Sequence, residues 1–132
     1  DGVIGDRTLA SSTIAVPRRS YRQLGSHLFR VLLHALIGLN QLGDTQCGFK
    51  FFKSEIARKL FSLQRVDGYM FDVEILLLAA RLGYGIEAIP VVWKDDPDSR
   101  FNPVWGMARN VGELLRISWS HRQLGSPENE LG

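Results

Sequence analysis

The stretch from Phe71 to Trp93, FDVEILLLAARLGYGIEAIPVVW, decides the fold class of this chain of 132 residues. Its first part is almost continuously apolar beyond the first turn and stops at Gly83, which predicts a buried helix over 71–82 with a glycine as its C-terminal cap. The part that follows is rich in Ile and Val and predicts a strand over 85–93. A helix that runs directly into a strand is typical of an α/β domain, and this is the fold class we expect.

Further helices are predicted on either side of this unit. Over about residues 18–39, apolar side chains recur at helical spacing, and the polar side chains fall within an arc of about 140°, which forms a continuous cationic stripe. The apolar set is Leu24, Leu28, Val31, Leu32, Ala35, Leu36 and Leu39, and the polar set is Arg19, Arg22, Gln23, Ser26, His27, Arg30 and His34. A second helix is expected to start at Ser54 as its N-cap, and an amphipathic helix to run from Asn102 and Pro103 toward Trp119.

The composition fits one globular domain, because 45% of the residues are hydrophobic. We assign residues 1–119 to this domain and 120–132 to a polar tail or linker. The formal net charge of +2 is too small to indicate a nucleic-acid partner, and a single cysteine excludes an internal disulfide. No apolar run approaches the roughly 20 residues that span a bilayer, so any membrane contact of this chain is expected to be peripheral.

The run Asp44–Lys53, DTQCGFKFFK, mixes an acid, an amide, a glycine and cations in a strand-like pattern. On a strand, Asp44, Gln46 and Lys50 would project to one face, and Gly48 would let a ligand approach the backbone closely. The mixture therefore predicts the wall of a site. The alternative is an ordinary half-buried strand whose polar residues face water.

The order of four segments resembles the second half of the family 2 inverting glycosyltransferases that act on polyprenyl or dolichyl phosphate, in particular the dolichyl-phosphate glucosyltransferase-like and mannosyltransferase-like branch. These segments are Asp44–Lys53, Gly68–Tyr84, Glu87–Trp93 and Asp98–Arg100, and the likeness covers roughly residues 1–119. It implies the acceptor-side half of a glycosyltransferase A-type, Rossmann-like domain. The chain starts without a methionine in what reads as the end of a strand, and we expect it to be part of a longer protein and inactive alone.

The resemblance also implies partners. A nucleotide sugar would be the donor and a polyprenyl phosphate the acceptor. The reaction would take place at the cytoplasmic face of a membrane. Whether the protein forms a homo-oligomer is left open. Mg²⁺ or Mn²⁺ is implied as the cofactor, with ligands upstream of residue 1. We assign no metal ligand within the chain, because the acids at 95, 96 and 98 are typical of a solvated loop. His27, His34 and His121 lack the spacing of a metal cluster and are expected on exposed helix faces or in the tail.

Three carboxylates are the candidate catalytic residues. Asp44 matches a motif that lines the reaction centre of the family, and Asp72 matches the place of the acid that acts as general base for a hydroxyl acceptor, with Glu74 beside it. A phosphate acceptor is already ionised near neutral pH, so Asp72 would instead orient the acceptor or a cation. The alternative for Asp72 and Glu74 is a helix-capping role, because carboxylates are favoured in a first turn by the helix dipole.

The remaining candidates bind the acceptor or its phosphate. Arg22 and Ser26 lie one helical turn apart and match an Arg-x-x-x-Ser pair that contacts the lipid phosphate in the mannosyltransferase branch. Arg7 follows the first strand where the family has Gly-Ser-Arg, although Asp6 here replaces the serine. Gln46 and Arg100 complete the set. The alternatives are a solvated helix face for Arg22 and Ser26, and a surface pair with Asp96 or Asp98 for Arg100.

Two other functions remain open from the sequence. One is a non-catalytic module that binds a membrane surface or a partner protein through the cationic helix. The other keeps glycosyl transfer but uses a saccharide hydroxyl as the acceptor, in which case Asp72 as a base becomes essential.

Overall fold

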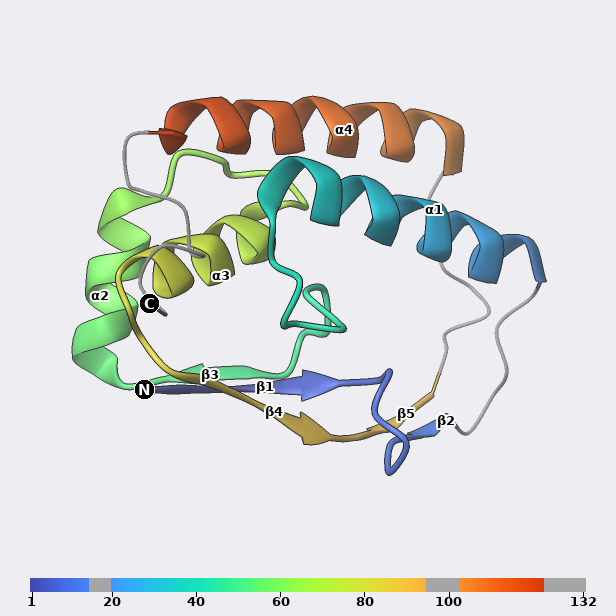
Figure 1. Ribbon diagram of the computed structural model, residues 1–132, viewed down its shortest axis with the longest axis horizontal. Coiled ribbons are helices and arrows are strands. Elements are labelled where there is room, and N and C mark those ends of the chain that lie inside the picture. Colours follow the sequence, from blue (N-terminus) through green and yellow to red (C-terminus); the bar gives the residue numbers. More distant parts are fainter. Residues whose placement is uncertain (15–19, 95–102, 123–132) are drawn as a thin grey trace.

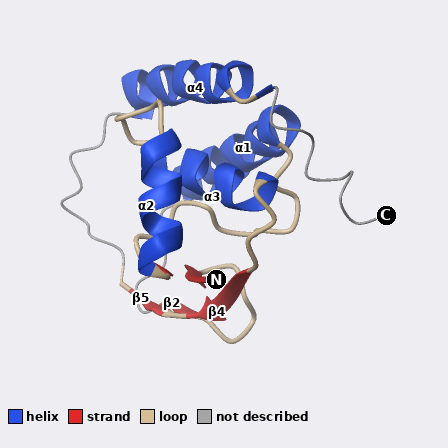
Figure 2. Ribbon diagram, turned by 90° about the vertical axis from the view of Figure 1, so that its left-hand side faces the viewer, coloured by secondary structure: helices blue, strands red, loops and turns tan. Residues whose placement is uncertain are grey.

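The structure is a computed structural model that describes residues 1–14, 20–94 and 103–122. Its described part is a small sheet covered on one face by four helices (Figure 1). A view turned by 90° shows the same two layers, with the strands below and the helices above (Figure 2). The architecture is mixed α/β, as predicted, and is compatible with part of a Rossmann-like domain.

The main sheet has three strands in the order β3-β1-β4. β1 (Gly2–Asp6) is central, pairs antiparallel with β3 (Lys50–Phe52), and pairs parallel with β4 (Ile86–Pro90) from Gly2 opposite Ile86 to Asp6 opposite Pro90. A second parallel pair joins β2 (Thr13–Ile14) to β5 (Val92–Trp93).

Two strand predictions were wrong in extent. The run 44–53 is a strand only over β3, because residues 43–49 form a loop that is tied to other segments by side-chain contacts. The predicted strand 85–93 is split into β4 and β5, which belong to different sheets. The chain changes partner at Val91, whose backbone N–H donates to the Ser12 hydroxyl at 3.0 Å.

The helices are α1 (Ser20–Ile37), α2 (Ser54–Leu63), α3 (Phe71–Arg81) and α4 (Pro103–Ser120). α3 is buried from Val73 to Ala79, and Gly83 follows it with a φ of 75°, so the predicted buried helix and its glycine cap are confirmed. Ser54 is not the N-cap of α2: Lys53 holds that position without a side-chain cap, and Ser54 is the first helical residue.

The face that α1 presents to the core matches the predicted apolar set only in part: Leu36 packs against the core and Leu39, just after the helix, is buried, as predicted. Phe29, Leu33 and Ile37 are buried in the main core cluster, whereas Leu24 and Leu28 are 71% and 63% exposed. Apolar residues surround most of this helix, so periodicity alone did not identify the row that packs. The buried row is the one that meets the core residues of α3 and α4, which include Leu76, Leu77, Leu114 and Ile117.

Glu74 and His121 form a polar contact inside the helical layer. Glu74 is fully buried, and its two carboxylate oxygens accept the backbone N–H groups of Arg65 and Val66, each at 2.8 Å. His121 Nε2 lies 2.6 Å from Glu74 Oε1, and the histidine is only 4% exposed. The prediction that His121 lies on an exposed face or in a tail was therefore wrong, because α4 brings it down onto the first turn of α3.

Candidate functional site

The candidate site lies at one edge of the three-stranded sheet. Because β1 and β4 are parallel, their carboxyl ends meet at this edge, and antiparallel β3 begins there. The loop 43–49 and the first turn of α3 reach the same edge through side-chain contacts. In open α/β sheets, ligands bind outside the carboxyl ends of the strands, so this is the edge at which a site is expected.

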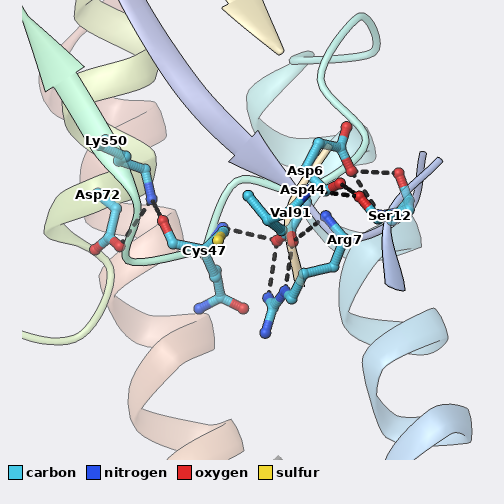
Figure 3. A network of polar contacts seen from close by, with 10 residues as sticks. Asp6, Arg7, Ser12, Asp44, Cys47, Lys50, Asp72 and Val91 are labelled. Atoms are coloured by element: carbon cyan, nitrogen blue, oxygen red, sulfur yellow. Dashed lines mark hydrogen bonds and ion pairs between the residues drawn. The ribbon is translucent and has the colours of Figure 1, made fainter. Parts of the chain in front are cut away.

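Arg7 and Asp44 form the centre of the site (Figure 3). Arg7 Nε lies 2.5 Å from Asp44 Oδ2, and Arg7 Nη2 lies 2.9 Å from Asp44 Oδ1, which is a two-point pairing of guanidinium and carboxylate. The side chains are 16% and 7% exposed, respectively. The Arg7 guanidinium also lies over the Trp93 ring, 4.8 Å from its centroid. The pair and the ring together fix the orientation of the cation.

The backbone supplies further donors to Asp44. The N–H groups of Arg7 and Gln46 donate to its two oxygens, each at 3.2 Å. Burial alone would raise the pKa of Asp44, but the hydrogen bonds and charge of Arg7, together with the donation from Gln46, outweigh it and hold the pKa below its ordinary value of 3.8. Asp44 is therefore ionised near neutral pH and is unsuited to accept a proton there.

Asp6 closes the turn that carries Arg7. Its Oδ1 accepts the backbone N–H of Thr8 at 2.7 Å and the Thr8 hydroxyl at 2.5 Å, and its carbonyl oxygen accepts the Ser12 hydroxyl at 2.5 Å. Gly43 passes so close that an added Cβ would lie 2.3 Å from Thr8 Oγ1. We missed this turn in the sequence, although an aspartate two residues before a threonine is a recognisable turn signal.

Lys50 and Asp72 form a second ion pair in the same network (Figure 3). Lys50 Nζ lies 3.1 Å from Asp72 Oδ2 and donates to the carbonyl oxygen of Cys47 at 2.5 Å. The two side chains are 12% and 15% exposed. Cys47 is buried, and its position in the loop links this pair to the Arg7–Asp44 pair. Two cations, each held by one carboxylate, therefore lie along one edge of the sheet.

An apolar groove of about 380 Å³ adjoins this edge. It is lined by Cys47, Phe49 and residues 89–93, so it shares Trp93 with the Arg7 contact. The groove lies directly beside the Arg7 guanidinium, a group that can bind an anion. This combination matches a ligand with a charged head and a hydrocarbon chain.

The other predicted site residues are placed as follows. Glu74 binds the 65–66 backbone and His121, and these contacts are those of a structural tie between helices. The side chain of Gln46 is exposed, and its contribution to Asp44 comes from its backbone N–H. Arg22 and Ser26 lie within the backbone of α1, but their side chains are outside the described part of the structure, and so is the whole of Arg100.

Neither a metal cluster nor a membrane-spanning helix is found among the residues described. No group of three or more His, Cys, Asp or Glu side chains in ranges 1–14, 20–94 and 103–122 is arranged to hold a metal ion. Within the same ranges, no helix combines the length and apolar character needed to cross a bilayer.

Comparison with known proteins gives several relatives that share one name. A dolichyl-phosphate beta-glucosyltransferase of Trichomonas vaginalis is 35% identical over 120 residues, which are 91% of this chain and 36% of the relative. A Drosophila melanogaster protein of the same name is 33% identical over 127 residues, 96% of this chain and 38% of the relative. The Saccharomyces cerevisiae protein is 39% identical over 98 residues, 74% of this chain and 29% of the relative. No family model and no solved structure matches.

The chain thus spans about a third of the length of the curated relatives that it matches. The stretch matched by the Drosophila relative covers 96% of this chain. On this similarity, the chain belongs to the dolichyl-phosphate glucosyltransferase-like group of family 2 glycosyltransferases.

Proposed function

We propose that this chain forms the acceptor side of an inverting glycosyltransferase of the A-type fold, which transfers glucose from a nucleotide sugar to dolichyl phosphate. The observation that carries the proposal is the pairing of two anchored cations, Arg7 and Lys50, with an apolar groove at the carboxyl edge of the sheet. The names of the relatives support the sugar and the acceptor.

The acceptor phosphate needs positioning more than it needs a base. It is ionised near neutral pH, so one of its oxygens can form the new bond to the anomeric carbon while the nucleoside diphosphate leaves with the bonding electron pair. In this proposal Arg7 and Lys50 bind the phosphate through charge-assisted hydrogen bonds, while Asp44 and Asp72 hold those cations in place. Asp44 and Asp72 are then positioning residues rather than proton acceptors.

The groove would take the first part of the hydrocarbon chain. Its lining by Phe49, Val92 and Trp93 is apolar, and it opens beside the cation that Trp93 stacks against. Arg22, Ser26, Gln46 and Arg100 stay in the proposal as further contacts of the acceptor or the diphosphate, on the strength of the family resemblance. The described contacts of Glu74 favour a structural role. Its assignment as a catalytic residue stays a prediction that rests on the family resemblance alone.

Mg²⁺ or Mn²⁺ is part of the proposal as the ion that neutralises the leaving diphosphate. The described residues contain no cluster of side chains that could hold this ion. We therefore assign its ligands to the part of the relatives' sequence, about two thirds of its length, that this chain does not match. We further propose that the transferase works at the cytoplasmic face of a membrane, where the acceptor lipid is held.

Direct binding of the acceptor tests the proposal on this chain. Vesicles containing dolichyl phosphate are compared with vesicles containing dolichol, with the surface charge equalised by phosphatidylserine. We expect tighter binding to dolichyl phosphate, and a loss of about 10- to 100-fold in that preference for Arg7→Ala, because a charge-assisted contact is removed. Arg58→Ala is the matched control, since Arg58 is exposed on α2. Equal binding to both vesicles would contradict the acceptor assignment.

A chimera tests the reaction itself. The 127-residue stretch of the Drosophila relative that matches this chain is replaced by the chain, and transfer of labelled glucose to dolichyl phosphate is measured. Transfer by the chimera, lost on Arg7→Ala with the fold retained, is the expected result. A folded chimera that binds dolichyl phosphate but transfers no glucose would argue for the non-catalytic alternative.

A further inference from the structure

The start of α3 is held by a carboxylate that comes from another helix. Met70 occupies the N-cap position of α3 without a side-chain cap, since its thioether is only a weak acceptor. Glu113 of α4 reaches this position, and its Oε2 accepts the backbone N–H of Met70 at 2.9 Å. A negative charge is favoured at the N-terminus of a helix by the helix dipole. α4 therefore supplies a charged cap to α3.

The contact is close enough to exclude any side chain at residue 68. A Cβ added to Gly68 would lie 1.8 Å from Glu113 Oε1, far inside the contact distance. The φ of Gly68 lies outside the left-handed region, so the backbone itself would accept an alanine. The glycine is therefore explained by the approach of Glu113 and not by the geometry of a turn.

A second contact joins α4 to the same segment. Glu74 accepts the backbone N–H groups at 65 and 66, each at 2.8 Å, and its Oε1 lies 2.6 Å from His121 Nε2. The segment 65–70 is thus held at one end by Glu113 and at the other end through Glu74. In Figure 1 this segment runs between α4 and α3. The entry into α3 is fixed by polar contacts that depend on the position of α4.

The first turn of α3 faces the candidate site on its other side. Asp72 and Glu74 lie two positions apart, which is about 200° around a helix, so Asp72 contacts Lys50 while Glu74 contacts His121. Lys50 Nζ lies 3.1 Å from Asp72 Oδ2. A displacement of this turn by about 1 Å would take the pair beyond hydrogen-bond distance. The position of the Lys50 cation therefore depends on what holds the first turn of α3.

From these contacts we infer that Glu113 is a positioning residue of the acceptor site, which acts through the start of α3 on Asp72 and on the Lys50 cation. Its partners are the Met70 N–H and, at 3.2 Å, the Arg109 Nε, so it acts on α3 and not on the ligand. The inference rests on the proposed function, which assigns Lys50 to the acceptor phosphate. A role in stability alone would move neither the Lys50 ammonium nor the KM for the acceptor.

The first test follows the Lys50 ammonium in this chain without any lipid. Its NMR signal reports how fast its protons exchange with water, and exchange is slowed while Asp72 and the Cys47 carbonyl hold the group. Glu113→Ala is expected to accelerate this exchange by about fivefold or more, because Asp72 moves away. Glu113→Gln should keep the exchange slow, since an amide oxygen can still accept the Met70 N–H.

Gly68→Ala disturbs the same contact without removing a polar group. Its Cβ should displace the Glu113 carboxylate and accelerate the Lys50 exchange, and in the double variant with Glu113→Ala the two effects should not add. Gly112→Ala is the matched control, because a Cβ at this neighbouring position on α4 meets nothing within 4 Å. Circular dichroism establishes that each variant is folded, and Glu113→Asp, whose reach is shorter, replaces any variant that is not.

Unchanged exchange in folded Gly68→Ala and Glu113→Ala would overturn the inference. So would an equal acceleration in Gly112→Ala. Both outcomes leave the acceptor assignment untouched, because no acceptor is present.

The second test measures transfer in the chimera with the Drosophila relative. Glu113→Ala is expected to raise the KM for dolichyl phosphate about threefold or more, with kcat changed by less than about twofold, and Glu113→Gln should restore most of the loss. The rise should disappear in an Asp72→Asn background, because the effect passes through Asp72. Ile56→Val, a conservative change in the buried face of α2, is the stability control and should leave KM unchanged.

A constant KM in Glu113→Ala, or an equal rise with and without Asp72, would overturn the positioning role. A chimera that binds no dolichyl phosphate, while Lys50 exchange still depends on Glu113, would instead contradict the proposed function. The two failures are therefore distinguishable.

Discussion

Arg7 and Asp44 lie 37 positions apart in the sequence and form a two-point ion pair at the carboxyl edge of β1. The side chains of Arg7 and Asp44 are only 16% and 7% exposed. Each charge has lost most of its hydration, and the ion pair offsets this desolvation penalty. The pair therefore has to be formed correctly for the loop 43–49 to reach its place at the edge. Both the stability of the fold and the shape of the candidate site therefore depend on this ion pair.

Removal of the Asp44 carboxylate should destabilise the chain. Asp44→Ala is expected to lower the free energy of unfolding by about 3 kcal/mol, because Arg7 would stay largely buried without its counter-ion. Urea denaturation measures the change. The matched control is Lys53→Ala, which removes an ion pair with Asp1 whose lysine is 71% exposed, and it should cost less than about 0.5 kcal/mol. Similar values for the two variants would show that the Arg7–Asp44 pair contributes little.

The same pair makes stability depend on pH in acid. Burial raises the pKa of Asp44, yet the hydrogen bonds and charge of Arg7 prevail and hold it below its ordinary value of 3.8. The folded state therefore binds fewer protons than the unfolded state in this range, so stability rises with pH. The contribution of Asp44 should be complete above about pH 5 and be lost as the pH falls below 3.8 toward the lower folded pKa.

Denaturation series over this range test the pH dependence. Asp44→Asn should show a shallower fall in the free energy of unfolding between about pH 5 and pH 2 than the unmodified chain. Parallel curves for the two proteins would mean that other carboxylates cause the acid sensitivity.

Glu74→Gln should destabilise the chain strongly despite its similar shape. Both carboxylate oxygens accept backbone N–H groups, so the amide nitrogen of a glutamine would face a donor, and the contact with His121 would weaken. A cost of about 3 kcal/mol is expected for this fully buried position. Thermal or urea unfolding checks it, with Glu87→Gln as the control, because Glu87 is exposed on β4. A cost equal to that of the control would rule out a structural role for Glu74.

Removal of the Lys50 cation should affect both transfer and stability, because Asp72 is only 15% exposed and loses its counter-ion. In the chimera with the Drosophila relative, Lys50→Met is expected to lower kcat/KM for dolichyl phosphate by about 10- to 100-fold, with a rise in KM, because a cation at the site edge is removed. Asp72→Asn should have a smaller effect in the same direction, since Lys50 keeps its charge and its bond to the Cys47 carbonyl. Lys59→Met on the exposed face of α2 is the control. Unchanged KM in Lys50→Met would remove Lys50 from the acceptor site.

The sequence was a good guide where local chemistry is strong. The buried helix α3 and its glycine cap followed from an unbroken apolar run and a residue that tolerates positive φ. The family resemblance was confirmed by the relatives, and it selected Arg7, Asp44 and Asp72, which the structure brings into one network. The strand predicted over 44–53 failed because side-chain contacts to Arg7 hold residues 43–49 as a loop, and no periodicity reveals such contacts.

Periodicity also failed in part for α1. Its sequence contains enough apolar residues for more than one face to satisfy the pattern, so the choice of Phe29, Leu33 and Ile37 as the buried row depended on what α3 and α4 present. Because that row is buried, the side chains of Leu24 and Leu28 are exposed to solvent. Trp105 and Trp119 of α4 are exposed, and their residue type alone does not decide this, because Trp in a helix is compatible with either a core or a surface position.

By itself, the sequence determined the fold class, the positions of the helices to within a few residues and the family. These properties follow from backbone preferences, from the spacing of apolar residues along one segment and from motifs that can be read in order. Only the tertiary structure decided which carboxylate meets which cation, which face of each helix is buried and that Glu74 ties α3 to α4. These pairings join residues far apart in the chain, and their energies depend on burial and distance, which exist only after the segments have packed.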